Sequence, residues 1–313
     1  MECFAKEGLP YNDYGQWIRR RMGTRMQKLP VNAGFSCPNR DGRLSTLGCS
    51  FCDNSSFTPS YCQPQTSITK QLEAGKIFFQ RKYPTAGYLA YFQSFSNTYA
   101  DIDTLRSRYE EALAVDGIRG LVISTRPDCL PESCLDYLEE LNRRTFLIVE
   151  IGIESMNDNT LKSLNRQYDT SCVRQAVDAL SRRGIITCGH VILGLPQENE
   201  EEMLRQARLI SDLPLQILKI HQFQVLRGTA IAEEWEDGRI HVATPDEYLT
   251  LLARYICRLR GDLILERFFS SSPLHQVLAP RWGIRPDSLN KRLGELMREK
   301  GWRQGMECLS FRG

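Results

Sequence analysis

The stretch Phe35-Ser-Cys-Pro-Asn-Arg-Asp-Gly-Arg-Leu-Ser-Thr-Leu-Gly-Cys-Ser-Phe-Cys52 brings three cysteines together in a short part of the chain. Eleven residues separate Cys37 from Cys49, two separate Cys49 from Cys52, and the aromatic Phe51 stands just before the last thiol. Three thiolates are one fewer than the four that close a tetrahedral zinc site or a cubane cluster. A [4Fe–4S] cluster held by only three cysteines keeps one iron open to another ligand. The spacing favours such an open site.

A closed zinc site is the alternative. Nine residues separate Cys52 from Cys62, which offers a fourth sulfur. Structural zinc sites usually place their cysteines in two short pairs, and this stretch holds only one Cys-x-x-Cys pair. The spacing alone therefore favours iron–sulfur over zinc without excluding zinc.

Length and composition are those of an ordinary globular protein. The chain has 313 residues, of which 42% are hydrophobic and 25% charged, which suits one large domain with an appendage or two domains. The N-terminus lacks the apolar segment of a signal peptide, and no apolar run is long enough to span a bilayer. Eleven cysteines without an export signal indicate a reducing cytoplasm. We therefore expect a cytoplasmic protein with no membrane contact.

Charge is unevenly distributed along the chain. Residues 1–30 carry a net charge of +3 and residues 254–313 carry +6, which leaves −7 for residues 31–253 given the total of +2. Basic ends around an acidic centre are compatible with a nucleic-acid footprint. Solvated helix faces explain any single basic patch equally well.

From residue 30 onward, short β-rich runs alternate with amphipathic helical stretches. Strictly alternating strands and helices imply parallel strands with right-handed crossovers. The expected strands are Pro30–Ser36, Gly87–Phe95, Gly120–Thr125, Phe146–Ile153, Ile185–Leu193 and Gln216–Leu226, with helices near 67–82, 101–116, 131–144, 170–183 and 200–212.

Six such units predict an α/β fold, a partial (βα)6 TIM-like barrel with a mostly helical C-terminal extension. Active sites of these folds lie at the C-terminal ends of the strands, which is where the cysteine stretch begins. We divide the chain into a basic N-terminal segment (1–29), the partial barrel (30–238) and the C-terminal helical extension (239–313).

Several motifs in chain order resemble the radical SAM superfamily, and in particular its bacterial YhcC/YtqA-type members, which are related to the Elongator catalytic subunit. The matching segments, which together cover most of residues 10–285, are Cys37-Pro-Asn-Arg-Asp-Gly through Gly48-Cys-Ser-Phe-Cys52, Tyr91-Phe-Gln-Ser-Phe-Ser-Asn-Thr-Tyr99, Ser124-Thr-Arg-Pro-Asp128, Gly152-Ile-Glu-Ser155, His190-Val-Ile-Leu-Gly-Leu-Pro196 and Leu278-Ala-Pro-Arg-Trp282. This resemblance implies a [4Fe–4S] cluster and S-adenosylmethionine (SAM) as cofactors, and a 5′-deoxyadenosyl radical that removes a hydrogen atom from the substrate.

The resemblance also implies residue roles. Cys37, Cys49 and Cys52 would be the iron ligands. The residues expected to contact SAM are Phe51, Gln93, Ser94, Ser124, Arg126, Glu154, Arg166 and His190. The Gly-Gly-Glu pattern usual near the SAM amino group is absent at Gln93 and Ser94. No residue is assigned a catalytic role towards the substrate.

Some of these residues have equally ordinary interpretations. Phe51 suits a space-filling ring, Arg166 suits an exposed helix position, and His190 suits a core histidine with a satisfied hydrogen bond. His221 and Gln224 face either the barrel interior or its outer helices, and the sequence does not decide between the two.

Resemblance to the Elongator-type enzymes implies a tRNA substrate, with the C5 side chain of a wobble uridine as the position modified. The basic segment Arg19–Lys28, beside Tyr14 and Trp17, offers cations for phosphates and aromatic rings for bases. An electron donor such as flavodoxin or ferredoxin is a further expected partner. The alternatives are a radical SAM enzyme acting on a small metabolite and a zinc-stabilised, non-catalytic RNA-binding protein.

Overall fold

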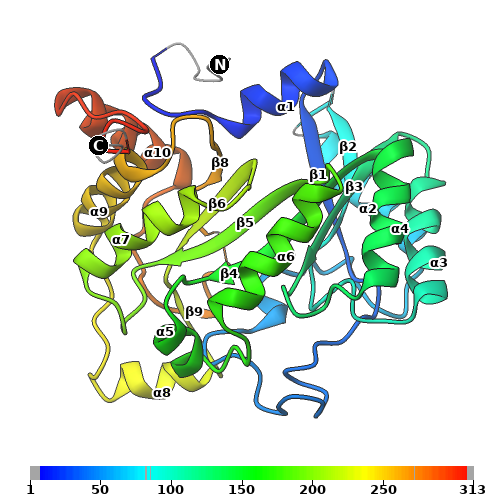
Figure 1. Ribbon diagram of the computed structural model, residues 1–313, viewed down its shortest axis with the longest axis horizontal. Coiled ribbons are helices and arrows are strands. Elements are labelled where there is room, and N and C mark those ends of the chain that lie inside the picture. The colour runs from blue at the N-terminus through cyan, green and yellow to red at the C-terminus, as the bar shows by residue number, and fades with distance from the viewer. Residues whose placement is uncertain (1–7, 82, 85, 271, 309–313) are drawn as a thin grey trace.

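Seven parallel strands form one curled sheet at the centre of the molecule (Figure 1). The computed structural model describes residues 8–81, 83–84, 86–270 and 272–308. The strand order is β1-β2-β3-β4-β5-β6-β8, so that β1 and β8 are its two edges. The strands are Met26–Val31 (β1), Gly87–Phe92 (β2), Ile118–Thr125 (β3), Phe146–Glu154 (β4), Ile186–Leu193 (β5), Ile217–Gln222 (β6) and Ile264–Arg267 (β8). This arrangement confirms the partial barrel.

Helices cover the outer face of the sheet, where the outward strand residues form the main apolar core with them. The helices are α1 (Tyr14–Met22), α2 (Ile68–Gln80), α3 (Ile102–Leu113), α4 (Glu132–Arg144), α5 (Asp158–Ser163), α6 (Thr170–Arg182), α7 (Glu200–Ser211), α8 (Ala230–Glu236), α9 (Pro245–Arg258) and α10 (Pro286–Glu299), with a 3-10 turn, η1 (Asn54–Phe57). Within the described ranges, no helix has the length and apolar character needed to cross a membrane.

The inner face of the sheet is apolar at one end of the barrel only. Because strand side chains alternate between the two faces, every second residue points inward. At the N-terminal end these inward residues pack against Ile18 of α1, which closes that end. The packed residues are Met26, Leu89, Val122, Ile148, Cys188, Ile217 and Ile264. The next inward residue on each strand is polar or charged, which leaves the other end open for chemistry.

Two strand predictions need correction. The first strand is Met26–Val31 rather than Pro30–Ser36. Its polar residues Gln27 and Lys28 hide the alternation, and Pro30 is tolerated because β1 is an edge strand. The segment predicted as one strand over Gln216–Leu226 is divided into β6 and the short β7 (Val225–Leu226), which pairs antiparallel with β9 (Val277–Ala279).

The C-terminal extension is mostly helical, as predicted, but it also supplies β8. This strand has four residues, and it pairs with β6 in parallel. Its inward side chain is the charged Glu266, so nothing in its sequence marks it as a buried strand. The seventh strand therefore comes from the part of the chain that we assigned to helices.

Candidate active site

The cysteine loop, residues 37–52, is held by its own backbone. Arg40 N donates to the Cys37 carbonyl at 2.8 Å, Gly48 N to the Asn39 carbonyl at 2.7 Å, and Cys52 N to the Cys49 carbonyl at 3.1 Å. Gly48 has φ of 74°, a left-handed conformation that suits glycine. The loop is therefore a folded unit rather than an extended strap.

Two barrel segments fix this loop in space. Ser50 N donates to the Leu164 carbonyl at the end of α5, and the Ser50 carbonyl accepts from Ile231 N of α8. The Asn165 side chain donates to the Gly48 carbonyl at 2.6 Å. In Figure 1 the loop, in blue, lies at the bottom near α5 and α8, at the opposite end of the barrel from α1.

A cavity of about 1240 Å³ lies between the cysteine loop and the C-terminal ends of the strands. Ten of the eleven residues predicted to hold the cluster or SAM line it: Cys37, Cys49, Cys52, Phe51, Gln93, Ser124, Arg126, Glu154, Arg166 and His190. The exception is Ser94, which is buried and whose hydroxyl lies 2.9 Å from that of Thr58. His221 and Gln224 also line the cavity, which places both inside the barrel.

Arg166 is buried in the cavity wall rather than exposed on a helix. Its Nη1 donates to the Cys49 thiol at 3.2 Å, and its Nη2 lies 3.4 Å from Glu154 Oε1. Burial opposes its charge, but Tyr168, Cys49 and Glu154 together hold the pKa of this guanidinium well above its usual value. The arginine thus ties the cysteine loop to the end of β4.

Arg126 has a different set of partners. It forms a bidentate pair with Asp128, with both N–O distances at 2.8 Å, and also donates to the Arg166 carbonyl. Its Nη1 is buried and has no hydrogen-bond partner in the described structure. This nitrogen is the donor that an added carboxylate could use at the cavity wall.

The donor set around the thiols fits an anionic, thiolate-ligated cluster. Besides Arg166, the Asn39 side-chain nitrogen lies 3.4 Å from the Cys49 sulfur. The Arg40 guanidinium donates to the Cys52 carbonyl. N–H groups directed at sulfur stabilise thiolates and set the potential of a cluster.

A four-cysteine zinc site does not fit this geometry. Cys62 is buried, donates to the Pro30 carbonyl at 3.0 Å and does not line the cavity. Tetrahedral Zn–S bonds of about 2.3 Å require sulfurs about 3.8 Å apart. Among the described residues, no three cysteine thiols lie within 4.8 Å of one another. The described thiols are therefore not arranged as the sulfurs of a tetrahedral zinc site are.

Part of the cavity wall is a charged layer that we did not predict as a unit. It is formed by the second inward residue of each strand: Lys28, Tyr91, Ser124, Glu150, His190, Lys219 and Glu266. Glu150 Oε1 accepts from Lys28 and Lys219, each at 2.7 Å. Its Oε2 accepts from Tyr91 at 2.7 Å and Ser124 at 2.8 Å.

Glu266 completes the layer from β8. Its Oε1 lies 2.6 Å from Lys28 Nζ and 3.4 Å from Lys219 Nζ. Burial opposes charge on Glu150, yet Lys219 and Lys28 hold its pKa well below the usual value. Two carboxylates and two ammonium groups thus balance one another in the barrel interior.

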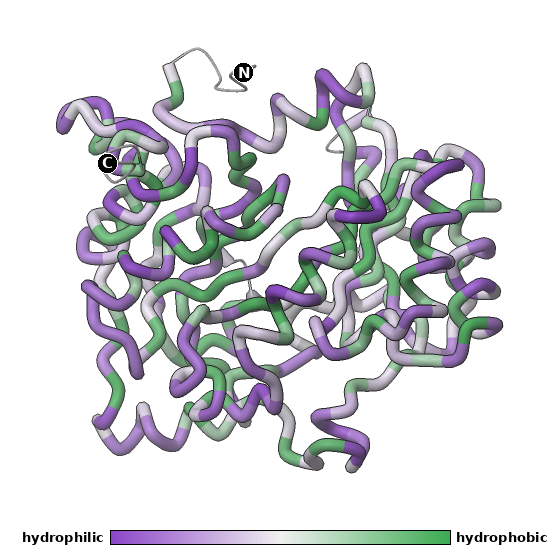
Figure 2. The backbone as a smooth tube through the Cα atoms, in the orientation of Figure 1, coloured by the Kyte–Doolittle hydropathy of each residue, from purple (hydrophilic) through white to green (hydrophobic). Residues whose placement is uncertain are grey.

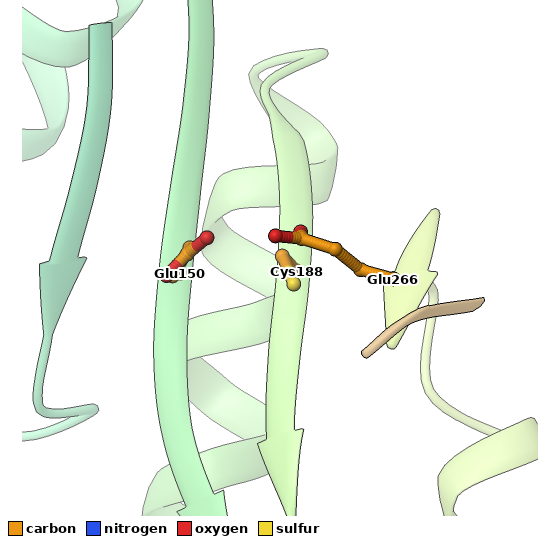
Figure 3. Close-up of side chains that lie close together, drawn as sticks. All are labelled: Glu150, Cys188 and Glu266. Carbon is orange, nitrogen blue, oxygen red and sulfur yellow. The ribbon is translucent and has the colours of Figure 1, made fainter. Parts of the chain in front are cut away.

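Figure 3 shows Glu150 and Glu266 reaching toward one another beside Cys188, with ligand atoms within 4.8 Å of each other. Such a trio can resemble a metal site. Here the Lys28 and Lys219 ammonium groups already bridge the two carboxylates. Since the positive charge is supplied by the protein, the trio needs no metal ion.

Two histidines lie side by side in the cavity wall: His190, which belongs to the charged layer, and His221, two residues after Lys219 on β6. The His190 and His221 ring centroids are 5.0 Å apart, and His190 Nε2 lies 3.2 Å from Glu150 Oε2. Burial lowers the pKa of both, and Lys219 adds to this effect. Both rings are therefore neutral at physiological pH.

A sequence signal for the charged layer does exist. Glu150 interrupts the apolar run of β4, and Lys219 interrupts that of β6. A charge at the centre of a buried strand implies a buried partner. The identity of the partner depends on how the strands are arranged around the barrel.

Comparisons with known proteins agree with this geometry. A family model of the radical SAM superfamily matches residues 41–210, and a radical SAM C-terminal domain model matches residues 215–297. The chain is 32% identical to YtqA of Bacillus subtilis over 94% of this chain and 92% of that protein. It is 34% identical to YhcC of Escherichia coli K12 over 87% of each.

More distant similarity reaches the Elongator proteins. Elongator complex protein 3 of Schizosaccharomyces pombe is 29% identical over 58% of this chain, which spans only 33% of that protein. The solved structure of Methanocaldococcus infernus Elp3 shares the fold, with a TM-score of 0.68 and 16% identity over 89% of this chain and 64% of that one. The chain therefore belongs to the radical SAM superfamily and is an enzyme whose cofactors are a [4Fe–4S] cluster and SAM.

Proposed function

We propose that this radical SAM enzyme modifies tRNA, at the C5 side chain of a wobble uridine. The observation that carries the proposal is a single cavity that joins the three thiols to a cationic, aromatic wall beside the open edge β1. When bound, the cluster and SAM supply a 5′-deoxyadenosyl radical that abstracts a hydrogen atom from the substrate. The chain's own residues bind the cofactors, orient the substrate and exclude water.

In this proposal Cys37, Cys49 and Cys52 hold three of the four irons. Phe51, Gln93, Ser124, Arg126, Glu154, Arg166 and His190 line the SAM part of the cavity. The unpartnered Nη1 of Arg126 suits the SAM carboxylate, and Glu154 suits the ribose hydroxyls. Ser94 faces Thr58 instead, so its predicted contact has no support from this geometry.

The choice of RNA rests on the chemistry of the cavity rim. Arg25 stacks on the ring of Tyr83 at 3.6 Å, and both residues line the cavity. Lys291 of α10 lines it too and is largely exposed. Cations that pair with phosphates, next to rings that stack on bases, are typical of RNA-binding surfaces. Arg19 and Arg21 of α1, the helix that closes the N-terminal end of the barrel, are exposed as well.

Two relatives point to the same substrate class. Elongator complex protein 3 and a tRNA uridine(34) acetyltransferase of Dehalococcoides mccartyi, 28% identical over 38% of this chain, share part of its sequence. This chain spans only 26% of the acetyltransferase, so acetyl transfer is not carried over. The cytoplasm is the compartment that suits both a tRNA substrate and a reduced cluster.

The test begins with anaerobic purification and analysis of iron, sulfide and zinc. Dithionite and SAM are then added, and 5′-deoxyadenosine is measured with and without tRNA that lacks wobble-uridine modifications. The proposal expects about four irons per chain, release of 5′-deoxyadenosine that increases with this tRNA, and a mass change at the wobble uridine. Release that tRNA leaves unchanged would favour a small metabolite. Stoichiometric zinc without SAM cleavage would leave an RNA-binding protein.

A further inference from the structure

Arg267, the last residue of β8, is a cation in the cavity wall that has no partner within the described residues. Its side chain is half-buried and lines the cavity. Among the described residues its guanidinium forms no hydrogen bond, and no carboxylate oxygen lies within 4.0 Å of its nitrogens. By contrast, Arg126 and Arg166 each lie beside a carboxylate. The donors of Arg267 are therefore available to a ligand.

The carboxylates that share this wall do not neutralise Arg267. Glu266 precedes it in the chain, but Glu266 Oε1 pairs with Lys28 and Lys219. Asp287 at the start of α10 also lines the cavity, but it is exposed to solvent. Along the strands of the sheet in Figure 2, hydrophilic colours interrupt the hydrophobic ones. Arg267 thus adds a positive charge to a layer whose other charges already balance.

His221 lies in the same part of the wall. Arg267 is opposite Lys219 in the register of β6 and β8, and His221 follows Lys219 by two residues. Burial lowers the pKa of His221 well below its usual value, and the charges of His190 and Arg267 lower it further. The buried Nε2 of His221 has no hydrogen-bond partner in the part of the chain that the structure describes. A guanidinium close to an imidazole N–H is suited to an anion.

The segment that follows β8 is fixed against the end of β6. Ser270 N donates to the Gln222 side-chain oxygen, and the Ser272 hydroxyl donates to the Gln224 side-chain oxygen at 2.9 Å. Ser270 lines the cavity three residues after Arg267, so its hydroxyl adds a further donor to this wall. Arginine guanidinium groups and serine hydroxyls are among the donors with which proteins contact nucleic-acid phosphates.

The cavity has room for a nucleotide as well as for SAM. A pocket for one small ligand usually encloses about 300–1000 Å³, whereas this cavity encloses about 1240 Å³. In the proposed function SAM occupies the part lined by Arg126, Glu154 and Arg166, and the wall that carries His221 and Arg267 is not part of that set. Enzymes that modify a base take it out of its stack into the active site, and the base brings its own phosphate with it.

We propose that Arg267 and His221 form the subsite for the phosphate of the nucleotide whose base is modified. This inference rests on the proposed function, because it takes a nucleotide as the substrate. Arg267 donates to two phosphate oxygens through its planar fork, and His221 donates to a third through Nε2. The subsite holds the nucleotide at the wall formed by β6 and β8, so that its base can extend into the rest of the cavity.

The experiment measures nucleotide binding to the enzyme with cluster and SAM bound, without a reductant, so that SAM is not cleaved. Titration calorimetry compares uridine with uridine 3′-monophosphate and uridine 5′-monophosphate. At least one monophosphate should bind about tenfold more tightly than uridine, because a charge-assisted hydrogen bond forms only with the phosphate. Arg267→Gln should abolish this preference and leave the affinity for uridine unchanged, whereas Arg267→Lys should keep part of it.

Arg285→Gln is the matched control. Arg285 is exposed, immediately precedes α10 and does not line the cavity, so the preference for the monophosphate should persist in this variant. Equal affinities for uridine and both monophosphates would overturn the subsite, as would binding of none of the three, or a preference that survives in Arg267→Gln. If the preference depends on Arg267 but tRNA does not increase 5′-deoxyadenosine release, the subsite stands and the proposed tRNA substrate is overturned.

Discussion

The cysteine loop and the charged layer lie at opposite sides of one cavity, yet the chain builds them in different ways. The loop is a contiguous segment held mainly by its own backbone and by two neighbouring turns. The charged layer takes one residue from each of seven strands, from Lys28 to Glu266. A site formed by one local segment should therefore keep its geometry when residues elsewhere are changed. A site formed by residues from seven strands should depend on the stability of the whole sheet.

The largest effect is expected when a ligand in the loop is removed. Cys49→Ala should abolish cluster incorporation and SAM cleavage while the protein stays folded, because the loop is local. Cys62→Ala should keep both activities, because Cys62 bonds to the Pro30 carbonyl outside the cavity. Iron content and 5′-deoxyadenosine release measure the outcome. Equal losses in the two variants would restore the four-cysteine interpretation.

The next effect concerns the charged layer. Glu150→Gln leaves the buried Lys28 and Lys219 with one carboxylate, Glu266, in place of two. Removing one partner of a buried ion pair costs about 3–5 kcal/mol of the free energy of unfolding. We expect a large drop in the urea concentration at the midpoint of unfolding. Tryptophan fluorescence measures this midpoint.

The control for this change is a surface pair. Glu110 on α3 pairs with Arg144 on α4, and both side chains are more than two-fifths exposed. Glu110→Gln should therefore cost less than about 1 kcal/mol. Equal decreases in the free energy of unfolding for the two substitutions would contradict this expectation. They would mean that the charges of the layer are as well solvated by water as charges on the surface.

The same contrast explains what the sequence predicted. Alternating strands and helices predicted the barrel, and three thiols at fixed spacing with motifs in strand order predicted ten of the residues that line its cavity. Glu150 and Lys219 stood inside apolar strands, but they are 69 residues apart in the chain and meet only through the curl of the sheet. The sequence did not predict strand β8, because its inward side chain, Glu266, is a charged member of that layer.

Ser94 shows where prediction from strand periodicity ends. Its place after β2 suggested a cofactor contact, but β2 ends at Phe92 and the following turn directs the Ser94 hydroxyl to Thr58. Periodicity assigns a residue to a face only within a regular strand. Beyond the strand end, the conformation of the turn decides.

The histidines predict a pH dependence of intermediate size. Burial and neighbouring cations lower the pKa of His221 well below its usual value, and the groups facing it are His190, Arg267, Lys219 and Glu150. Below pH of about 6.5 the unfolded chain binds a proton that folded His221 does not, so stability falls as pH falls, by about 1.4 kcal/mol per pH unit for such a histidine.

His221→Gln should therefore reduce the slope of stability against pH between about pH 5 and 6.5. Urea midpoints at several pH values measure this slope. Glu150 acts in a lower window: its pKa is depressed, so its contribution is present at neutral pH and is lost only as pH falls below the usual carboxyl range. An unchanged slope would mean that folded His221 takes up its proton as readily as the unfolded chain does.

The smallest effect is expected for a substitution of a glycine in the cysteine loop. Gly48→Ala forces an L-residue into φ of 74° and brings its Cβ to 2.9 Å from the Arg40 guanidinium carbon. The left-handed conformation costs about 1 kcal/mol. Because the loop opens locally, this cost should appear as an about fivefold higher iron requirement for reconstitution, with an unchanged urea midpoint.

Gly261→Ala is the control, because Gly261 does not have a positive φ and the methyl group of an alanine there would point into open space. It should change neither iron uptake nor stability. A drop in the urea midpoint for Gly48→Ala as large as that for Glu150→Gln would contradict the contrast between the two regions. It would show that the loop is part of the barrel's cooperative core, so that cluster binding and folding of the charged layer are one event.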